Sequence, residues 1–189
     1  MSLRLIYLVL TFDRDSFPKI LLHRSQGLRA NPNLALDWLN RCMSDHSECF
    51  QQPQVGRPTR LLQINDSNKG KGEPQVHLIE TGNASEPYVA LSHCWGTIQP
   101  VCTTKENYEI HTNGIQFTSL PRSFQDAVTV TRTLGANLLW IDSLCIVQNS
   151  HEDWEQECPR MASIYANALV TIAAADAPDT VDPAQTRQI

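Results

Sequence analysis

Two short segments of this chain carry the residue types of a nucleophilic site. His93 and Cys94 are adjacent, and Asp142 directly follows the apolar run 138–141. An imidazole lowers the pKa of a nearby thiol and a carboxylate orients the imidazole, so the three types would suit a cysteine-dependent hydrolase. Adjacent strand residues point to opposite faces, however, which is poor geometry for a bond between His93 and Cys94. We therefore favour a buried Cys94 and a His93 that packs or caps.

Asp142 and Trp95 are the side chains best placed to meet a ligand. A carboxylate directly after Leu-Leu-Trp-Ile must either accept backbone N–H bonds in the following turn or face a ligand, and both alternatives stay open. Trp95, in a turn beside Gly96, is a candidate for stacking a flat ligand such as a nucleobase. We expect Trp140 and Trp154 to belong to the core, because large aromatic residues at strand and helix positions usually do.

A partial metal motif occurs near the N-terminus. Cys42, His46 and Cys49 have residue types and spacing that suit three zinc ligands, but a closed structural site needs four, and no fourth is obvious nearby. We favour a helix end with one histidine and two thiols packed on the core. No cofactor is certain from these residues, and the common phosphate-loop, dinucleotide, zinc-protease and serine-hydrolase signatures do not occur.

Composition limits the class of protein. The 189 residues are 41% hydrophobic and 19% charged, which predicts one globular domain with extensions. A net charge of -5 and the absence of a basic stripe argue against a nucleic-acid partner. The apolar run 3–12 is far shorter than the roughly 20 residues of a membrane span. Six irregularly spaced cysteines without a secretory signal indicate reduced thiols and a cytoplasmic protein.

The elements that position these residues alternate between short apolar runs and amphipathic stretches. Pro159 should break the last helix, and Ser150 with Asp153 has the spacing of a capping box at its start. The expected elements are a strand in 3–12, a helix at about 31–43, a hairpin from 61–64 and 76–79, strands at 88–92, 138–141 and 169–174, and helices over 121–135 and from 151 to 168.

This alternation predicts an α/β fold of three layers, with a mostly parallel sheet and flanking helices. We expect an N-terminal extension over 1–85, a main domain over 86–175 and a disordered tail over 176–189. Ligands of such sheets bind beyond the carboxyl ends of the strands. The candidate ligand-binding residues are therefore Ser92, His93, Cys94, Trp95, Gly96, Asp142, Ser143 and Cys145.

Four blocks of the sequence follow one another in the order of a known family. They are residues 88–96 with Ser-His-Cys-Trp-Gly, residues 120–127 with Leu-Pro and Asp-Ala followed by Leu134-Gly135, residues 139–148 with Leu-Trp-Ile-Asp-Ser-Leu-Cys-Ile-Val-Gln, and a block with Asp153, Trp154, Glu157, Met161, Ile164, Tyr165, Ala168, Thr171 and Ile172. Together they resemble the fungal heterokaryon incompatibility (HET) domain. Trp38-Leu39 with the Cys42, His46 and Cys49 motif is similar to a lead-in often found before it.

The resemblance implies non-self recognition and programmed cell-death signalling, with other incompatibility or signalling proteins, or further copies of the chain, as partners. HET domains look like distant relatives of TIR domains, which have a flavodoxin-like fold, and some TIR domains cleave NAD with a catalytic glutamate. NAD is thus a possible ligand or substrate, and Asp142 and Glu157 are the candidate catalytic carboxylates. The family's Arg-x-Trp-x-x-Gln-Glu block does not occur before Ile189. We expect an incomplete domain that lacks NAD hydrolysis.

Overall fold

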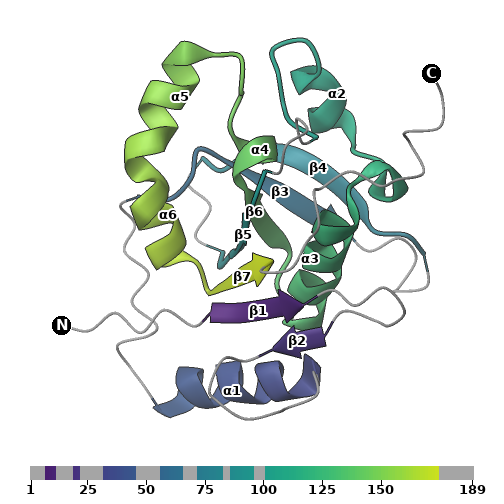
Figure 1. The fold of residues 1–189 in the computed structure, drawn as a ribbon, viewed down its shortest axis with the longest axis vertical. Coiled ribbons are helices and arrows are strands. Elements are labelled where there is room, and N and C mark those ends of the chain that lie inside the picture. The colour runs from purple at the N-terminus through teal and green to yellow at the C-terminus, as the bar shows by residue number, and fades with distance from the viewer. Residues whose placement is uncertain are drawn as a thin grey trace.

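One open sheet organises the described part of the molecule. The computed structural model describes residues 7–11, 19–21, 32–45, 56–65, 72–82, 86–95 and 101–174. Seven strands pair in the order β2-β1-β7-β5-β6-β3-β4 (Figure 1). Their bounds are Tyr7–Thr11 (β1), Lys19–Leu21 (β2), Arg60–Asn65 (β3), Gln75–Glu80 (β4), Val89–His93 (β5), Leu138–Ile141 (β6) and Val170–Ala174 (β7).

The sheet is mixed, which corrects the prediction of a mostly parallel sheet. The four central strands β1, β7, β5 and β6 run parallel to one another. The outer pairings β1–β2, β3–β6 and β3–β4 are antiparallel. One physical reason is the short connection between β3 and β4, which returns the chain antiparallel, since a parallel return needs a longer crossover. This hairpin joins the sheet beside β6. The predicted hairpin is itself confirmed.

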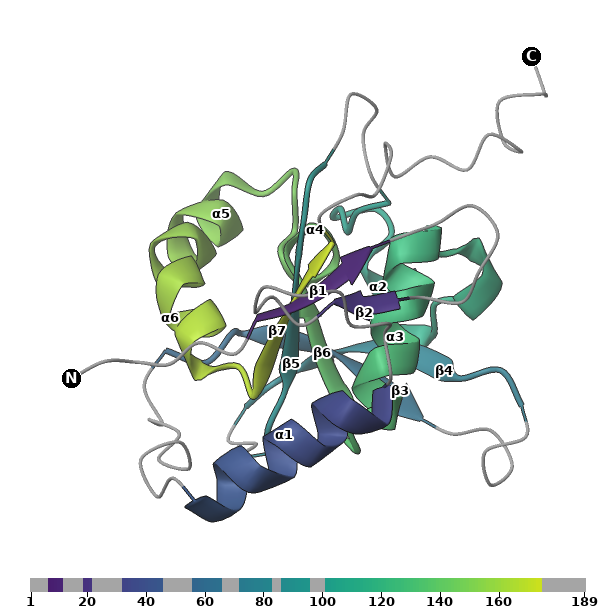
Figure 2. The ribbon, with the colours of Figure 1, turned by 60° about the horizontal axis from the view of Figure 1, so that its bottom comes forward.

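Helices cover both faces of the sheet. In Figures 1 and 2, α3 lies on one side of the strands and α5 with α6 on the other, and α1 packs beside α3. The helix bounds are Pro32–Asp45 (α1), Tyr108–Asn113 (α2), Arg122–Thr133 (α3), Asp142–Cys145 (α4), His151–Glu157 (α5) and Met161–Asn167 (α6), with short 3-10 turns η2 (Phe117–Ser119) and η3 (Cys158–Arg160). The fold is therefore α/β with helices on both faces of an open mixed sheet.

The connections after β5 and β6 leave toward opposite faces. After β5 the chain passes through α2 and α3 and returns as β6, whereas after β6 it passes through α5 and α6 and returns as β7 on the far side of β5. Two neighbouring parallel strands whose connections diverge in this way open a crevice at their carboxyl ends. In this chain the strand ends at that place are His93 and Ile141.

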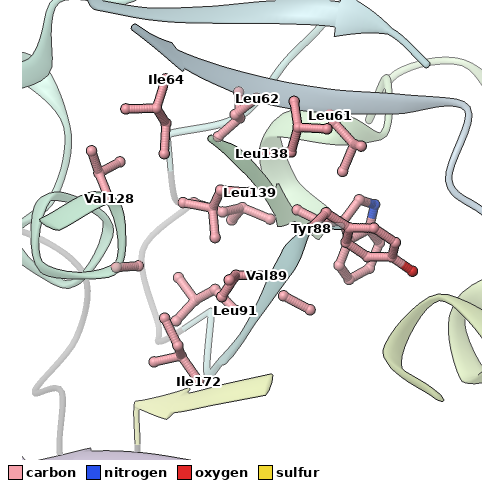
Figure 3. Close-up of a cluster of buried hydrophobic side chains, with 14 of the residues drawn as sticks. Leu61, Leu62, Ile64, Tyr88, Val89, Leu91, Val128, Leu138, Leu139 and Ile172 are labelled. Atoms are coloured by element: carbon pink, nitrogen blue, oxygen red, sulfur yellow. The ribbon is translucent and has the colours of Figure 1, made fainter. Parts of the chain in front are cut away.

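The core lies between the sheet and its two helical layers. Figure 3 shows Leu62 and Ile64 of β3, Leu91 of β5, Leu139 of β6 and Val128 of α3 meeting in one cluster. All of these are buried, as is the whole of β6, which explains the unbroken apolar run at 138–141. On the other face, the Tyr88 hydroxyl donates to Ile164 O of α6 at 2.5 Å.

Most of the predicted elements are confirmed, with two local corrections. Pro159 lies in η3, which separates α5 from α6, so the predicted break is present. The predicted capping box is wrong, because Ser150 makes no side-chain cap bond and Asp153 pairs with Arg60 instead. Trp154, expected in the core, is 51% exposed. Within the described residues, no helix is long and apolar enough to cross a membrane.

Some predictions fall partly or wholly outside the described residues. These include the tail 176–189, Gly96, and two residues of the metal motif, His46 and Cys49. Cys42 belongs to α1, but only its backbone is described. The division into an extension over 1–85 and a domain over 86–175 stays a prediction, although β1 to β4 share the sheet of the later strands.

Candidate ligand site at the ends of strands five and six

Asp142 is the centre of the candidate site. It follows β6 directly and opens the one-turn helix α4. Its Oδ1 accepts the Ser143 backbone N–H at 2.8 Å, and its Oδ2 accepts the Trp95 indole N–H at 2.9 Å. The side chain keeps 15% of its surface exposed. The first of the two alternatives is therefore confirmed, since the carboxylate accepts a backbone N–H, and the part of the side chain that reaches solvent leaves the second, a ligand contact, a prediction.

His93 lies beside this carboxylate but is closed off from solvent. Its Nδ1 is 3.6 Å from Asp142 Oδ1, and its side chain has no exposed surface. The ring packs edge-on against Phe124 of α3, with 4.9 Å between centroids. Burial lowers the pKa of His93, and the charge of Asp142 opposes that shift. The prediction of a packed His93 is confirmed.

Cys94 and Trp95 lie on the solvent side of the same turn. Both are exposed, so the expectation of a buried Cys94 is wrong. The strand alternation explains the difference, because His93 takes the inward position at the end of β5 and Cys94 follows it outward. Cys94 is exposed and forms no disulfide, whereas the His93 side chain has no exposed surface. The imidazole and the thiol therefore do not form the bond that an activated nucleophile needs.

Ser92 and Tyr165 border the site on the opposite face of the sheet. Ser92 is exposed, and the Tyr165 hydroxyl of α6 donates to Leu91 O at 3.4 Å. Burial raises the pKa of Tyr165 to about 12, the charge of Asp142 adds to that shift, and a hydrogen bond with Ser92 opposes it. Tyr165 is thus a neutral phenol whose pKa responds to the Asp142 charge.

Two predicted ligand-binding residues face the interior. Ser143 has no exposed surface, and it contacts Asp142 through its backbone N–H, which donates to the carboxylate. Cys145 is buried, and burial raises the pKa of its thiol to about 12. A thiol with that pKa stays protonated at neutral pH, so Cys145 is neither a nucleophile nor a ready metal ligand in this conformation.

A buried ion pair from β3 supports the turn that carries Asp142. Arg60 donates from Nε to Cys145 O at 2.9 Å and forms an ion pair with Asp153. Asp153 Oδ2 in turn accepts the Val147 N–H at 2.7 Å. The Gln148 side chain donates to Asp142 O at 3.0 Å. These bonds fix both ends of the segment that follows β6.

Glu157, the second candidate catalytic carboxylate, occupies a different place. It has no exposed surface and accepts bonds from the Thr59 backbone N–H at 3.3 Å, from the Thr59 hydroxyl, and from Arg160 Nη1 at 3.0 Å. Arg160 Nη2 also donates to Arg57 O. The carboxylate therefore ties the start of the β3 hairpin to α5, and the structure does not bring it into contact with Asp142.

A separate open hollow of about 470 Å³ lies between the starts of α2 and α5. Lys105, Tyr108, Ser150 and Asp153 contribute to its lining. None of its lining residues belongs to the Asp142 cluster, which consists of Ser92, His93, Cys94, Trp95, Phe124, Asp142, Ser143 and Tyr165. We place the candidate site at Asp142 and not in this hollow, because divergent strand connections and convergent polar groups meet there. Within the described residues, no three histidine, cysteine or acidic side chains gather as a metal site.

Sequence reasoning missed two residues of the site. Phe124 holds the His93 ring, and Tyr165 contacts the strand on its other side. Helical spacing in the sequence predicted that Phe124 and Tyr165 lie on the inward faces of their helices. It could not show which strand residues they would contact.

Comparison with known proteins identifies the family. A family model described as heterokaryon incompatibility protein (HET) matches residues 88–188, which is 101 of the 189 residues. No match was found among the curated proteins or among the solved structures. The matched range includes every residue of the Asp142 cluster, from Ser92 to Tyr165. This chain belongs to the heterokaryon incompatibility protein (HET) family.

Proposed function

We propose that this chain is a signalling module of fungal non-self recognition and programmed cell death that binds the nucleoside part of NAD, or of a related nucleotide, at Asp142 and Trp95. The family supports the signalling role. The TIR-like relationship belongs to the same proposal, and the divergent connections at β5 and β6 support it. Other incompatibility proteins or further copies of the chain are the proposed partners.

The Trp95–Asp142 bond is the observation that carries the binding proposal. An exposed indole whose N–H is fixed at 2.9 Å to a carboxylate presents a ring face in a defined orientation. Base stacking on an aromatic side chain contributes about 1–3 kcal/mol per base. The exposed part of Asp142 offers acceptor oxygens of the kind that bind ribose hydroxyls at strand ends. The pair therefore suits a nucleoside better than a bare phosphate.

A cytoplasmic location is part of the proposal. The four cysteines whose side chains are described, Cys94, Cys102, Cys145 and Cys158, are free thiols. Unpaired thiols, one of them exposed at the candidate site, are typical of reducing compartments.

Tryptophan fluorescence during NAD titration tests the binding proposal. We expect NAD to quench the wild-type chain and Asp142→Asn to weaken binding about tenfold or more, since a hydrogen bond to a charged group contributes about 1.5–3 kcal/mol. Trp95→Ala should abolish the quenching. Trp154→Phe is the matched control, because Trp154 is exposed on α5 outside the cluster and its variant should keep the wild-type affinity. Equal quenching in Trp95→Ala and wild type would refute the site.

NAD hydrolysis is the second candidate function, and the partly exposed carboxylate of Asp142 is the observation in its favour. Against it, both Asp142 oxygens already accept hydrogen bonds, and among the described residues no second carboxylate contacts Asp142 or His93. We therefore propose binding without cleavage. Nicotinamide release by the purified chain that disappears in Asp142→Ala would favour the hydrolase instead.

Cysteine-dependent hydrolysis is a third candidate function, and the observation in its favour is that the Cys94 thiol is free and exposed. The neighbouring imidazole faces away from the thiol into the core, so Cys94 lacks the base that would activate it. Cys94→Ser should leave NAD binding unchanged, and loss of an esterase activity in that variant would support the third candidate.

A further inference from the structure

The His93 ring is an unusual buried group. Its side chain has no exposed surface, and neither ring nitrogen has a hydrogen-bond partner among the described residues. Most buried polar atoms have such a partner, so this one requires an explanation. Asp142 Oδ1 lies 3.6 Å from Nδ1, which is just too far for a hydrogen bond.

Among the described residues, Asp142 is the one charged group that acts on the pKa of His93. From the end of β6, Asp142 faces Nδ1. From α3, Phe124 contacts the ring without charge, and Asp126 is paired with Arg122 at 3.2 Å. Tyr165 packs on the opposite face of the sheet against Trp140. On β7, His93 pairs with Ala174, which is buried and apolar.

We propose that His93 is a positioning residue whose protonation controls whether the Asp142 carboxylate serves Trp95 and the ligand or turns toward the imidazole. The inference rests on the proposed function, since it concerns the same carboxylate. A neutral imidazole carries one N–H, whereas the cation carries two. The added proton, taken from solvent, guarantees a donor at Nδ1, and a charge-assisted bond of about 2.7–2.9 Å would draw Oδ1 inward.

Movement of one carboxylate oxygen displaces the other, because the group is planar and rigid. As Oδ1 closes the 3.6 Å gap to His93, Oδ2 moves relative to the Trp95 indole and weakens the 2.9 Å bond. The cation also neutralises the charge that Asp142 offers to a ligand. Protonation of His93 therefore releases the Trp95 indole from its fixed orientation and, at the same time, weakens Asp142 as an acceptor for the ligand.

The sign of the pH dependence follows from the burial of the ring. Burial lowers the pKa of His93, so the neutral, ligand-competent form prevails at neutral pH. Affinity should fall as pH drops through that lowered pKa, by about tenfold for each further pH unit, because the competent fraction falls tenfold. Acid also destabilises the fold, since the unfolded histidine takes up a proton at its ordinary pKa. Circular dichroism must therefore show that the chain is folded throughout the titrated range.

NMR of the full, ligand-free chain tests the inference. We expect the Trp95 indole N–H resonance to titrate with the same midpoint as the His93 ring, and to lose its pH dependence in His93→Gln. In Asp142→Asn the His93 ring should titrate at still lower pH while the indole no longer follows it. His151→Gln is the matched control, because that exposed histidine pairs with Glu155 on α5, away from the cluster.

The outcomes separate this inference from the proposed function. An indole resonance that does not titrate in the wild type, or that titrates unchanged in His93→Gln, would overturn the inference. If His93→Gln fails to fold, the wild type and Asp142→Asn decide it. If the Trp95 indole and the His93 ring titrate together but NAD does not bind, the role of His93 is supported and NAD binding is refuted. If NAD binds but the indole resonance is independent of pH, NAD binding is supported and the role of His93 is refuted.

Discussion

The role of Glu157 gives a prediction whose magnitude follows from the structure. Glu157→Ala removes the acceptor of the Thr59 N–H, the Thr59 hydroxyl and Arg160 Nη1. Removing one partner of a buried ion pair costs about 3–5 kcal/mol. The Arg160 side chain is 35% exposed and regains water, so we reduce the expected loss to about 2–4 kcal/mol. Glu157→Gln keeps acceptors for Thr59 and should cost about 1–2 kcal/mol.

Urea unfolding followed by circular dichroism measures this effect. With a slope of about 2 kcal/mol/M, the midpoint of Glu157→Ala should fall by about 1–2 M. Glu155→Gln is the control, because the Glu155 side chain is 64% exposed on the same helix and should leave the midpoint unchanged. If the midpoint of Glu157→Ala equals that of the wild type, Glu157 does not stabilise the fold by tying Thr59 to α5. It would then again be a candidate catalytic residue.

Three further predictions concern single side chains. In the native chain, iodoacetamide should alkylate the exposed Cys94 and spare Cys145, because burial raises the pKa of the Cys145 thiol to about 12. Peptide mass spectrometry checks this prediction, and modification of Cys145 would contradict its burial. Tyr88→Phe, which leaves Ile164 O without its donor, should lower the free energy of unfolding by about 1–3 kcal/mol in urea melts. Gly135→Ala should lower the free energy of unfolding by about 1 kcal/mol, because Gly135 follows α3 with a left-handed φ of 75° and an added Cβ meets no neighbouring atom there. An unchanged urea melt would contradict the left-handed conformation of Gly135.

Local signals in the sequence predicted the strands and helices well. Residues 138–141 and 170–174 are apolar runs that could only be buried, and both are central strands. Pro159 ended a helix because its ring and missing N–H act on its own turn. The position of Asp142 was also predictable, since a carboxylate after a buried strand must lie at the sheet edge.

Contacts between distant residues could not be predicted in the same way. Asp153 was assigned to Ser150 three residues away, but it pairs with Arg60, which is 93 residues away in the chain. The antiparallel addition of β3 beside β6 is a similar case, because no local pattern states which strand a hairpin will join. The exposed Trp154 shows the limit of helical spacing, which places a residue on a face without showing whether anything covers it.

Two-dimensional NMR during NAD titration shows directly whether a nucleotide binds at Asp142 and Trp95. We expect the Trp95 indole N–H and the Ser143 backbone N–H to shift first and together, because both donate to the Asp142 carboxylate. Shifts confined to Tyr108 and Ser150 would place the ligand in the hollow between α2 and α5, and an unchanged spectrum would show that NAD does not bind. Either of those results would refute nucleotide binding at Asp142 and Trp95.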